Sequence, residues 1–89
     1  MPTVTLPRVL APVTPELRLE IGGDTLAEAL EDLFDRAPGL RVHLMDEAGA
    51  LRAHVSCFVN GVADRLDDRT APLGPSSRID FIQAVSGGS

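Results

Sequence analysis

The strongest structural signal in this sequence is one amphipathic helix. Apolar residues recur with the spacing of a single buried helical face, at Leu26, Ala29, Leu30, Leu33 and Phe34. Thr25 and Glu28 have the spacing of a capping box, in which each side chain accepts a hydrogen bond from the other residue's backbone N–H. Pro38-Gly39 stops the pattern. We therefore predict a helix from Thr25 to about Arg36, with its apolar face buried.

Two segments before this helix alternate in the manner of half-buried strands. In residues 3–10 (TVTLPRVL), apolar side chains lie opposite the threonines, and Pro7 predicts a bulge or an edge exit because it cannot donate to a ladder. Residues 16–21 (ELRLEI) alternate between apolar and charged side chains. The five turn-like residues between them, 11–15, join the two segments into a predicted hairpin.

Two further strands are predicted after the helix. Residues 53–60 (AHVSCFVN) lead into a strong turn signal at Asn60-Gly61, and residues 78–85 (RIDFIQAV) form the last strand. Residues 40–52 are ambiguous, because a short alternation there gives way to a loop. The charge-rich residues 63–77 are predicted to form a solvated loop.

This order of elements predicts an α+β fold. A strand hairpin, a helix and further strands that complete a mixed sheet form the ubiquitin-like β-grasp pattern, with four to five strands packed on one main helix. We expect the last strand at the centre of the sheet, beside the first, because its apolar run needs neighbours on both sides. A chain of 89 residues builds one small core, so we predict a single β-grasp domain over residues 1–85 and a flexible tail over residues 86–89 that contains Gly-Gly.

The charge balance argues against nucleic-acid binding. Thirteen acidic and eight basic residues give a net charge of −5, whereas phosphate binding requires a positive surface. An acidic surface favours solubility and a basic partner protein. All the basic residues are arginine, so the chain has no lysine to form a Schiff base or to carry an isopeptide bond. The sequence shows neither a signal-peptide pattern nor a membrane-length apolar stretch, so we expect a cytoplasmic protein without membrane contacts.

Few residues have a setting that suggests catalysis or metal binding. Cys57 falls on the core side of its predicted strand, where a cysteine is an inert apolar residue. His43 and His54 lie eleven residues apart without a third candidate ligand, which argues against a zinc site. Asp24 and Thr25 are explained by helix capping. We therefore expect no catalytic residue, no metal site and no tightly bound cofactor, and we do not expect an enzyme.

The C-terminus is the most distinctive chemical feature of the chain. The last predicted strand is followed within a few residues by Gly87-Gly88 and a final Ser89. Alone, such an end also fits a frayed terminus or a cloning linker. Four segments add to the pattern: GDTL at 23–26, HLMDEAG at 43–49, FVNG at 58–61 and IDFIQAVSGG at 79–88. Together with the order of elements, they resemble the MoaD/ThiS family of ubiquitin-like sulfur carriers, and most of all the branch used in cysteine biosynthesis and related thiolation pathways.

This resemblance implies chemistry at the carboxylate of Gly88. In the family, an E1-like adenylating enzyme uses ATP and magnesium to form an acyl-adenylate at this position. A sulfur donor then displaces AMP and leaves a thiocarboxylate, which supplies sulfur to an acceptor synthase. Glycine has no β-carbon, so Gly87 and Gly88, with Ser86 before them, are suited to thread a narrow channel of the enzyme.

Ser89 departs from the family pattern, because family members usually end on a free Gly-Gly carboxylate. With Ser89 in place, Gly88 is amide-bonded and cannot be adenylated. Some members carry a short extension that a metalloprotease of the JAMM type removes, which leads to the hypothesis that Ser89 is trimmed. Ser89 could instead be a cloning remnant, or the carrier role could have been lost.

Strand parity suggests where the adenylating enzyme would dock. Ile79 and Phe81 should face the helix, which leaves Ile82 on the outer side of the last strand. The same reasoning leaves Phe58 on the outer side of its strand. We predict that Phe58 and Ile82 form a small exposed patch that anchors the partner, although scattered surface apolar residues would give the same pattern.

The resemblance leaves other functions open. The chain could be a ubiquitin-like modifier that joins Gly88 to lysines of target proteins, or the small subunit of a molybdopterin-synthase-like complex. It could also be an interaction domain with an idle tail. The metabolite that receives sulfur is equally open, since cysteine, thiamine thiazole, molybdopterin and a secondary metabolite are all compatible with the sequence.

Overall fold

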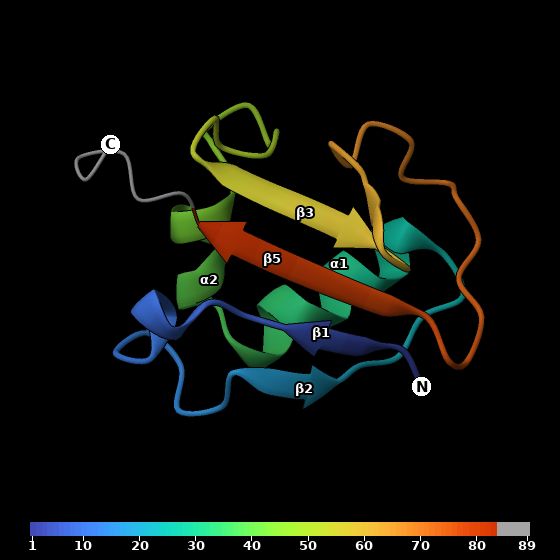
Figure 1. Cartoon of the computed structure of the whole chain (residues 1–89), viewed down its shortest axis with the longest axis horizontal. Helices are drawn as coiled ribbons and strands as arrows, with labels where there is room; N and C mark the ends of the chain where they lie inside the picture. Colours follow the sequence, from blue (N-terminus) through green and yellow to red (C-terminus); the bar gives the residue numbers. More distant parts are fainter. Residues whose placement is uncertain (84–89) are drawn as a thin grey trace.

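The computed structural model describes residues 1–83, which form one mixed sheet with helices on one side (Figure 1). The strands are β1 (Thr3–Thr5), β2 (Arg18–Glu20), β3 (Val55–Val59), β4 (Val62–Ala63) and β5 (Arg78–Gln83). The helices are a short 3-10 turn, η1 (Arg8–Leu10), and two α-helices, α1 (Leu26–Arg36) and α2 (Gly39–Leu44). The strand order β2-β1-β5-β3-β4, with α1 across one face, is the ubiquitin-like β-grasp arrangement that the sequence predicts.

β5 occupies the centre of the sheet, as expected from its apolar run. It runs parallel to β1 on one side and antiparallel to β3 on the other. Its inward residues, Ile79 and Phe81, are buried, and Phe81 lies opposite Cys57 of β3. β1 pairs with Arg78 to Asp80, whereas β3 pairs with Ile79 to Gln83, so β3 alone holds the last three residues of the strand.

α1 forms where its apolar stripe and capping signals predict it. The five residues of the predicted stripe are its buried residues. The Glu28 N–H donates a hydrogen bond of 3.3 Å to the Thr25 hydroxyl, as a capping box requires. The Glu28 carboxylate, however, accepts a hydrogen bond of 2.8 Å from the N–H of Asp24 rather than from that of Thr25. The reciprocal bond of the predicted box is thus shifted by one residue toward the N-terminus.

The predicted strand at residues 3–10 is too long. β1 ends at Thr5, and η1 takes up the last three residues of the predicted strand. Pro7 is the physical reason, because it offers no N–H to a neighbouring strand and its fixed φ suits the start of a helical turn. The turn places Leu10 in the core, where 2% of its surface is exposed.

Residues 40–52, which the sequence leaves ambiguous, contain α2 and a tight turn. Leu40 and Leu44 are fully buried one helical turn apart, whereas Val42 between them is 66% exposed. A strand would place all three side chains on one face, so this burial pattern fits a helix and not a strand. Met45 and Leu51 then pair across the turn, and both are buried.

The predicted turn at Asn60-Gly61 is confirmed. Both residues have positive φ angles, 52° and 84°, which is the backbone geometry of a two-residue hairpin. This turn joins β3 to β4, a short strand at the edge of the sheet that brings the number of strands to five.

Residues 64–77 form the predicted loop, and Arg65, Asp67 and Asp68 of its charge run are exposed, but Leu66 within that run departs from the prediction. Leu66 is buried and has a positive φ of 63°. The guanidinium of Arg65 donates to the Leu51 carbonyl at 3.0 Å, and that of Arg69 donates to the Gly49 carbonyl at 2.7 Å. Arg65 and Arg69 therefore tie the loop to the turn after α2, while most of the charge run stays exposed.

The same loop also completes the N-terminus of α1. The carbonyls of Arg69 and Ala71 accept hydrogen bonds of 2.8 and 2.9 Å from the N–H groups of Ala27 and Leu26. These donors belong to the first turn of the helix, which has no intrahelical acceptors for them. A segment more than forty residues away in sequence thus supplies the partners.

Both α-helices lie on one side of the sheet, and the opposite side is open in the described part of the chain (Figure 1). Among residues 1–83, no helix has the length and apolar character needed to cross a membrane.

Candidate functional site

The predicted reactive end of the chain lies outside the described residues. Ser86, Gly87, Gly88 and Ser89 all belong to this part. What the structure describes is the strand that leads to them and the surface around that strand. β5 ends at Gln83, which pairs with Val55 at the start of β3.

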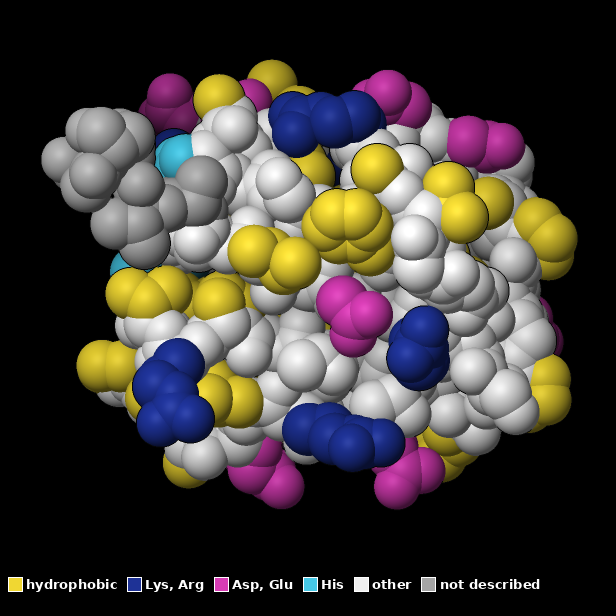
Figure 2. All heavy atoms as spheres, viewed as in Figure 1, with side chains coloured by type: hydrophobic (Ala, Val, Ile, Leu, Met, Phe, Trp, Pro, Cys, Tyr) yellow, Lys and Arg dark blue, Asp and Glu magenta, His cyan; other side chains and the backbone are white. Residues whose placement is uncertain are grey.

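The outward side chains of the strands form the surface that we call the open sheet face (Figure 2). Strand register defines its members, because residues opposite one another point to the same side. One row crosses the whole sheet and consists of Arg18, Thr5, Asp80, Phe58 and Ala63. The neighbouring rows contain Glu20, Thr3 and Arg78 on one side, and Ile82 and Ser56 on the other.

The two predicted anchor residues lie together on this face. Ser56 is opposite Ile82 and Phe58 is opposite Asp80, so Phe58 and Ile82 are diagonal neighbours on adjacent strands. Ile82 is 52% exposed, whereas Phe58 is half-buried. Figure 2 shows hydrophobic side chains gathered over this part of the sheet. The apolar area is small, and we refer to Phe58 and Ile82 as the apolar patch.

The same face also carries charged residues, which the sequence-based prediction of the site did not include. Arg78 and Asp80 alternate with Ile79 and Phe81 along β5, so they share the outer side with Ile82. Strand parity alone could have identified them, because the same alternation places Ile82 outward. The open sheet face therefore combines an apolar patch with charged groups on the central strand.

Cys57 lies on the opposite side of β3 and has no accessible thiol. Its side chain is in the core, with 2% of the residue exposed. Burial raises the pKa of Cys57 from 9.0 to about 12, and the nearby carboxylates of Asp64 and Asp80 add to this effect. A thiol that stays protonated at neutral pH is a poor nucleophile, which fits the prediction of an inert core residue.

The remaining polar candidates have structural roles or lie apart. His43 is in α2 and His54 precedes β3, and both are exposed. Within residues 1–83, no three His, Cys, Asp or Glu side chains lie close enough together to hold a metal ion. Gly22 donates its N–H to Asp32 at 2.8 Å. At Gly23, φ is +136° and an added β-carbon would lie 2.7 Å from the Ala29 nitrogen, so this glycine permits close contact with α1.

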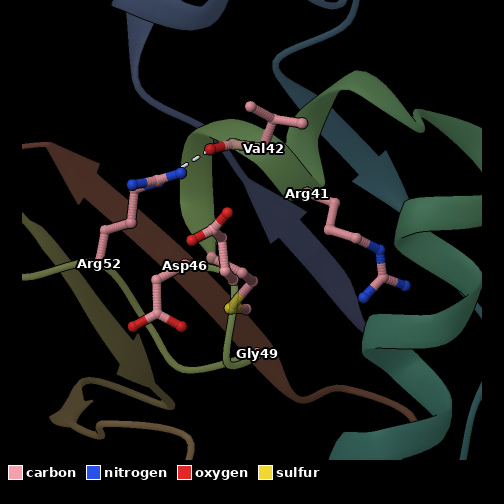
Figure 3. Close-up of a pocket in the computed structure, with 7 residues that line it drawn as sticks. Arg41, Val42, Asp46, Gly49 and Arg52 are labelled. Atoms are coloured by element: carbon pink, nitrogen blue, oxygen red, sulfur yellow. Dashed lines mark hydrogen bonds between the residues drawn. The ribbon is translucent and has the colours of Figure 1, made fainter.

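A hollow of about 620 Å³ opens between α2 and the turn that follows it (Figure 3). Three of its four charged side chains, Arg41, Asp46 and Arg52, already have partners. Nε of Arg52 donates to the Val42 carbonyl at 2.8 Å, and Asp46 accepts two hydrogen bonds of 2.9 Å from N–H groups of its own turn. The Arg41 guanidinium lies 4.7 Å from the centre of the Phe34 ring. These contacts hold the turn and the helix in place, and we assign no ligand to this hollow.

Comparison with known proteins connects this geometry to a family. The ThiS family model matches residues 4–88, which run from β1 through Gly88. No curated protein sequence matches the chain significantly.

Several solved structures share the fold over nearly the whole chain. A chain of the BexX/CysO complex of Amycolatopsis orientalis is 27% identical, with a TM-score of 0.83, and the match covers 99% of this chain and 100% of that one. CysO of Mycobacterium tuberculosis, described as an antigen, is 28% identical, with a TM-score of 0.80 and coverage of 96% and 100%. Small archaeal modifier protein 1 of Haloferax volcanii is 26% identical, with a TM-score of 0.76 and coverage of 98% of each chain.

Proposed function

Because this chain belongs to the ThiS family, we propose that it is a sulfur carrier whose working group is the carboxylate of Gly88. The observation that carries this proposal is the family match itself, which extends from residue 4 through residue 88 and so includes Gly87-Gly88. The similarity to CysO of Mycobacterium tuberculosis and to a chain of the BexX/CysO complex, each matched over its full length, supports the branch that the sequence resembles. In this role the chain is a substrate of enzymes rather than an enzyme.

The chemistry at Gly88 would take place in two steps. An oxygen of the carboxylate attacks the α-phosphorus of ATP, pyrophosphate leaves, and an acyl-adenylate forms on a partner enzyme that holds ATP and magnesium. A sulfur donor at the oxidation level of sulfide then attacks the acyl carbon, and AMP leaves with the electron pair of the broken C–O bond. The product is a thiocarboxylate. Both steps require a free carboxylate, so the Gly88–Ser89 amide must first be hydrolysed.

The fold supports such a role by fixing the base of the tail. β5 is paired with β3 up to Gln83, so the origin of the tail is held by the sheet. Gly88 is the fifth residue after Gln83. Five extended residues span at most about 18 Å, so the reacting carbon must lie within that radius of the end of β5. A partner that binds beside β5 therefore needs its active site close to its docking surface.

We assign the docking of the adenylating enzyme to the apolar patch. Ile82 lies one residue before Gln83, at the end of β5 nearest the tail, and Phe58 is its diagonal neighbour. An exposed isoleucine beside a half-buried phenylalanine offers apolar surface that a partner can bury. Contacts here would offset the entropy lost when the tail is ordered in a channel, about 1–2 kcal/mol for each backbone residue.

Removal of Ser89 would precede these reactions. Hydrolysis of the last peptide bond adds water and releases serine, and a metalloprotease of the JAMM type is the proposed catalyst. A chain that ends at Gly88 should then be the active form. The intact mass of the protein isolated from its native host tests this step, because a mature form that retains Ser89 while sulfur transfer proceeds contradicts it.

The acceptor of the sulfur is an enzyme that makes a sulfur-containing metabolite. The similarity to CysO chains favours cysteine or a related thiolated product. One of these chains was solved in a complex with BexX, which supports a partner protein that receives the carrier. For this chain, we expect the protein that receives the carrier to be an acceptor synthase.

A second candidate function is that of a ubiquitin-like modifier. The similarity to small archaeal modifier protein 1 over 98% of both chains favours it. The activated carboxyl of Gly88 would then form an isopeptide bond with a lysine of a target protein. Because the chain has no lysine, side-chain-linked chains of this modifier could not form, and each target lysine would carry a single copy.

One experiment separates these functions. Two forms of the chain, one that ends at Gly88 and one that retains Ser89, are incubated with ATP, magnesium, sulfide and the adenylating enzyme of the source organism, and their intact masses are measured. We expect the mass increase of one oxygen-to-sulfur exchange only in the form that ends at Gly88. Absence of this product in both forms would contradict the carrier function, and high-mass adducts in cells that only an isopeptidase removes would favour the modifier.

A further inference from the structure

Asp80 occupies the centre of the open sheet face. In register it lies opposite Phe58 of β3 and Thr5 of β1, and Ile82 follows two residues later on the same side of β5. Positions related in this way are about 5–7 Å apart. In Figure 2 an acidic side chain lies next to the hydrophobic side chains near the middle of this face. A surface that covers both residues of the apolar patch must therefore also cover Asp80.

The carboxylate of Asp80 has no partner in the described part of the chain. Within residues 1–83, the one ion pair joins Arg36 to Asp32 on α1, and Asp80 accepts no hydrogen bond from another side chain or from the backbone. Arg78 and Arg18 share its face without forming an ion pair with it. Asp80 is half-buried, so water can reach its carboxylate while the face is open.

Covering this carboxylate has a large energetic consequence. Removing the water from a charged group costs several kcal/mol unless an opposite charge or a set of hydrogen bonds replaces that water. Burial of the apolar patch gains less than this, because it comprises two side chains. A partner that docks here must therefore compensate Asp80.

We propose that the protein surface that covers Phe58 and Ile82 places an arginine or lysine side chain against Asp80. This inference rests on the proposed function, because it takes the adenylating enzyme as the partner. The net charge of −5 agrees in sign, since it attracts a basic surface at long range. Asp80 is then a specificity-determining residue, because a partner with an uncharged or acidic group at that place would leave the Asp80 carboxylate uncompensated.

Of the two arginines on this face, Arg78 is the nearer one that could replace the partner's cation, because Arg18 lies two strands away from Asp80. Arg78 lies two residues before Asp80 on the same side of β5 and is exposed. A change of its side-chain torsions on docking could bring it to Asp80, and the partner would then need no cation. The test therefore includes a variant of Arg78.

The experiment measures how well variants of the chain ending at Gly88 are activated. The readout is ATP–pyrophosphate exchange by the adenylating enzyme of the source organism, with KM for the carrier and kcat determined separately. For Asp80→Asn, which removes the charge and keeps the shape, we expect KM to rise about tenfold or more. We expect kcat to stay unchanged, because the proposed contact serves docking and Asp80 lies eight residues before the reacting Gly88 in the sequence.

Two matched variants serve as controls. Glu20→Gln removes the same charge from the same face, but from edge strand β2, on the row of Thr3 and Arg78. Arg78→Gln removes the internal cation. We expect KM to change less than about twofold in both, because neither group faces the covered centre. Thermal unfolding of each variant shows whether it is folded, and Asp80→Asn should keep its Tm, because Asp80 has no partner to lose in the described part of the chain.

Each other outcome overturns the inference in a recognisable way. An unchanged KM for Asp80→Asn shows that no cation of the enzyme meets this residue. An equal rise in KM for Arg78→Gln assigns the counter-ion to this chain. If light scattering shows a dimer that Asp80→Asn dissociates, the face belongs to a second copy. If the unaltered carrier supports no exchange at all, the proposed function fails, and the partner assumed here fails with it.

Discussion

The two sides of β5 have different relations to the rest of the molecule. Ile79 and Phe81 point inward, are 0% and 2% exposed, and have all their neighbours within the chain. Arg78, Asp80 and Ile82 point outward, and the Asp80 carboxylate, which has no partner among residues 1–83, lies beside an exposed isoleucine. One residue step along the same strand thus separates side chains that hold the fold from side chains that are available to a partner. We therefore expect that stability and recognition can be changed independently in this strand.

The largest expected effect tests this separation directly. Ile79→Ala removes a fully buried side chain from the middle of the central strand and should lower the free energy of unfolding by about 2–5 kcal/mol. Ile82→Ala makes the same chemical change three residues later on a side chain that is 52% exposed, and should cost less than about 1 kcal/mol. Urea denaturation of both variants measures the difference. Equal losses would mean that the two sides of β5 are not energetically distinct.

The side of the sheet that packs against the helices should also be sensitive to small backbone changes at the start of α1. Gly23→Ala should destabilise the protein by about 1–3 kcal/mol, because φ is +136° and the new β-carbon would lie 2.7 Å from the Ala29 nitrogen. Gly22→Ala is the matched control, since its β-carbon would lie 3.8 Å from Asp32 and at no positive φ. Chemical denaturation compares them. A stable Gly23→Ala protein would show that the loop before α1 can move away from the helix.

The pH dependence of stability probes the core through Cys57, which lies on the side of the sheet that faces the helices. Its pKa is about 12 in the folded chain against 9.0 for an ordinary thiol, mainly because of burial. Since the folded value is the higher one, this stability is complete below pH 9 and is lost as the pH rises toward 12. The free energy of unfolding should fall by up to about 1.4 kcal/mol per pH unit in that range.

The sequence makes this pH range easy to interpret. The chain has no lysine and no tyrosine, and arginine stays charged at these pH values. Denaturation at several pH values between 9 and 11 measures the slope for the unaltered protein and for Cys57→Ala. The variant should lack most of the slope. A slope that persists in Cys57→Ala would assign it to another group.

The smallest expected effect concerns a contact at the surface of α1. The Gly22 N–H, followed by Arg36, lowers the pKa of Asp32, whose carboxylate accepts hydrogen bonds of 2.8 and 2.9 Å from them. Because the folded pKa is the lower one, the contribution is present above about pH 4 and is lost as the pH falls. Asp32→Asn should cost less than about 1 kcal/mol at pH 7, and Asp35→Asn, on an exposed site, should cost less still. A loss of several kcal/mol would place this surface contact on a level with the core.

The candidate site was predictable where it depends on strand parity. The alternation in RIDFIQ already separates Ile79 and Phe81 from Ile82, and the structure has this separation. The pairing of β5 with β3 was not predictable in register, and it is this register that puts Asp80 opposite Phe58. A shift of one residue would have moved every side chain of one strand to the other face. The residues of the site could thus be named from the sequence, whereas their arrangement could not.

The sequence by itself determined the elements that depend on neighbours within one or two turns of chain. The apolar stripe and cap of α1, the Asn60-Gly61 turn and the two-residue alternation of β5 are encoded in this way, because their hydrogen bonds and buried faces involve nearby residues. Only the tertiary structure decided that Leu66 enters the core, that Arg65 and Arg69 bind distant carbonyls, and that α2 forms in place of a strand. Each of these depends on groups that are distant in sequence and come close only in the folded chain. Local spacing carries no information about such groups.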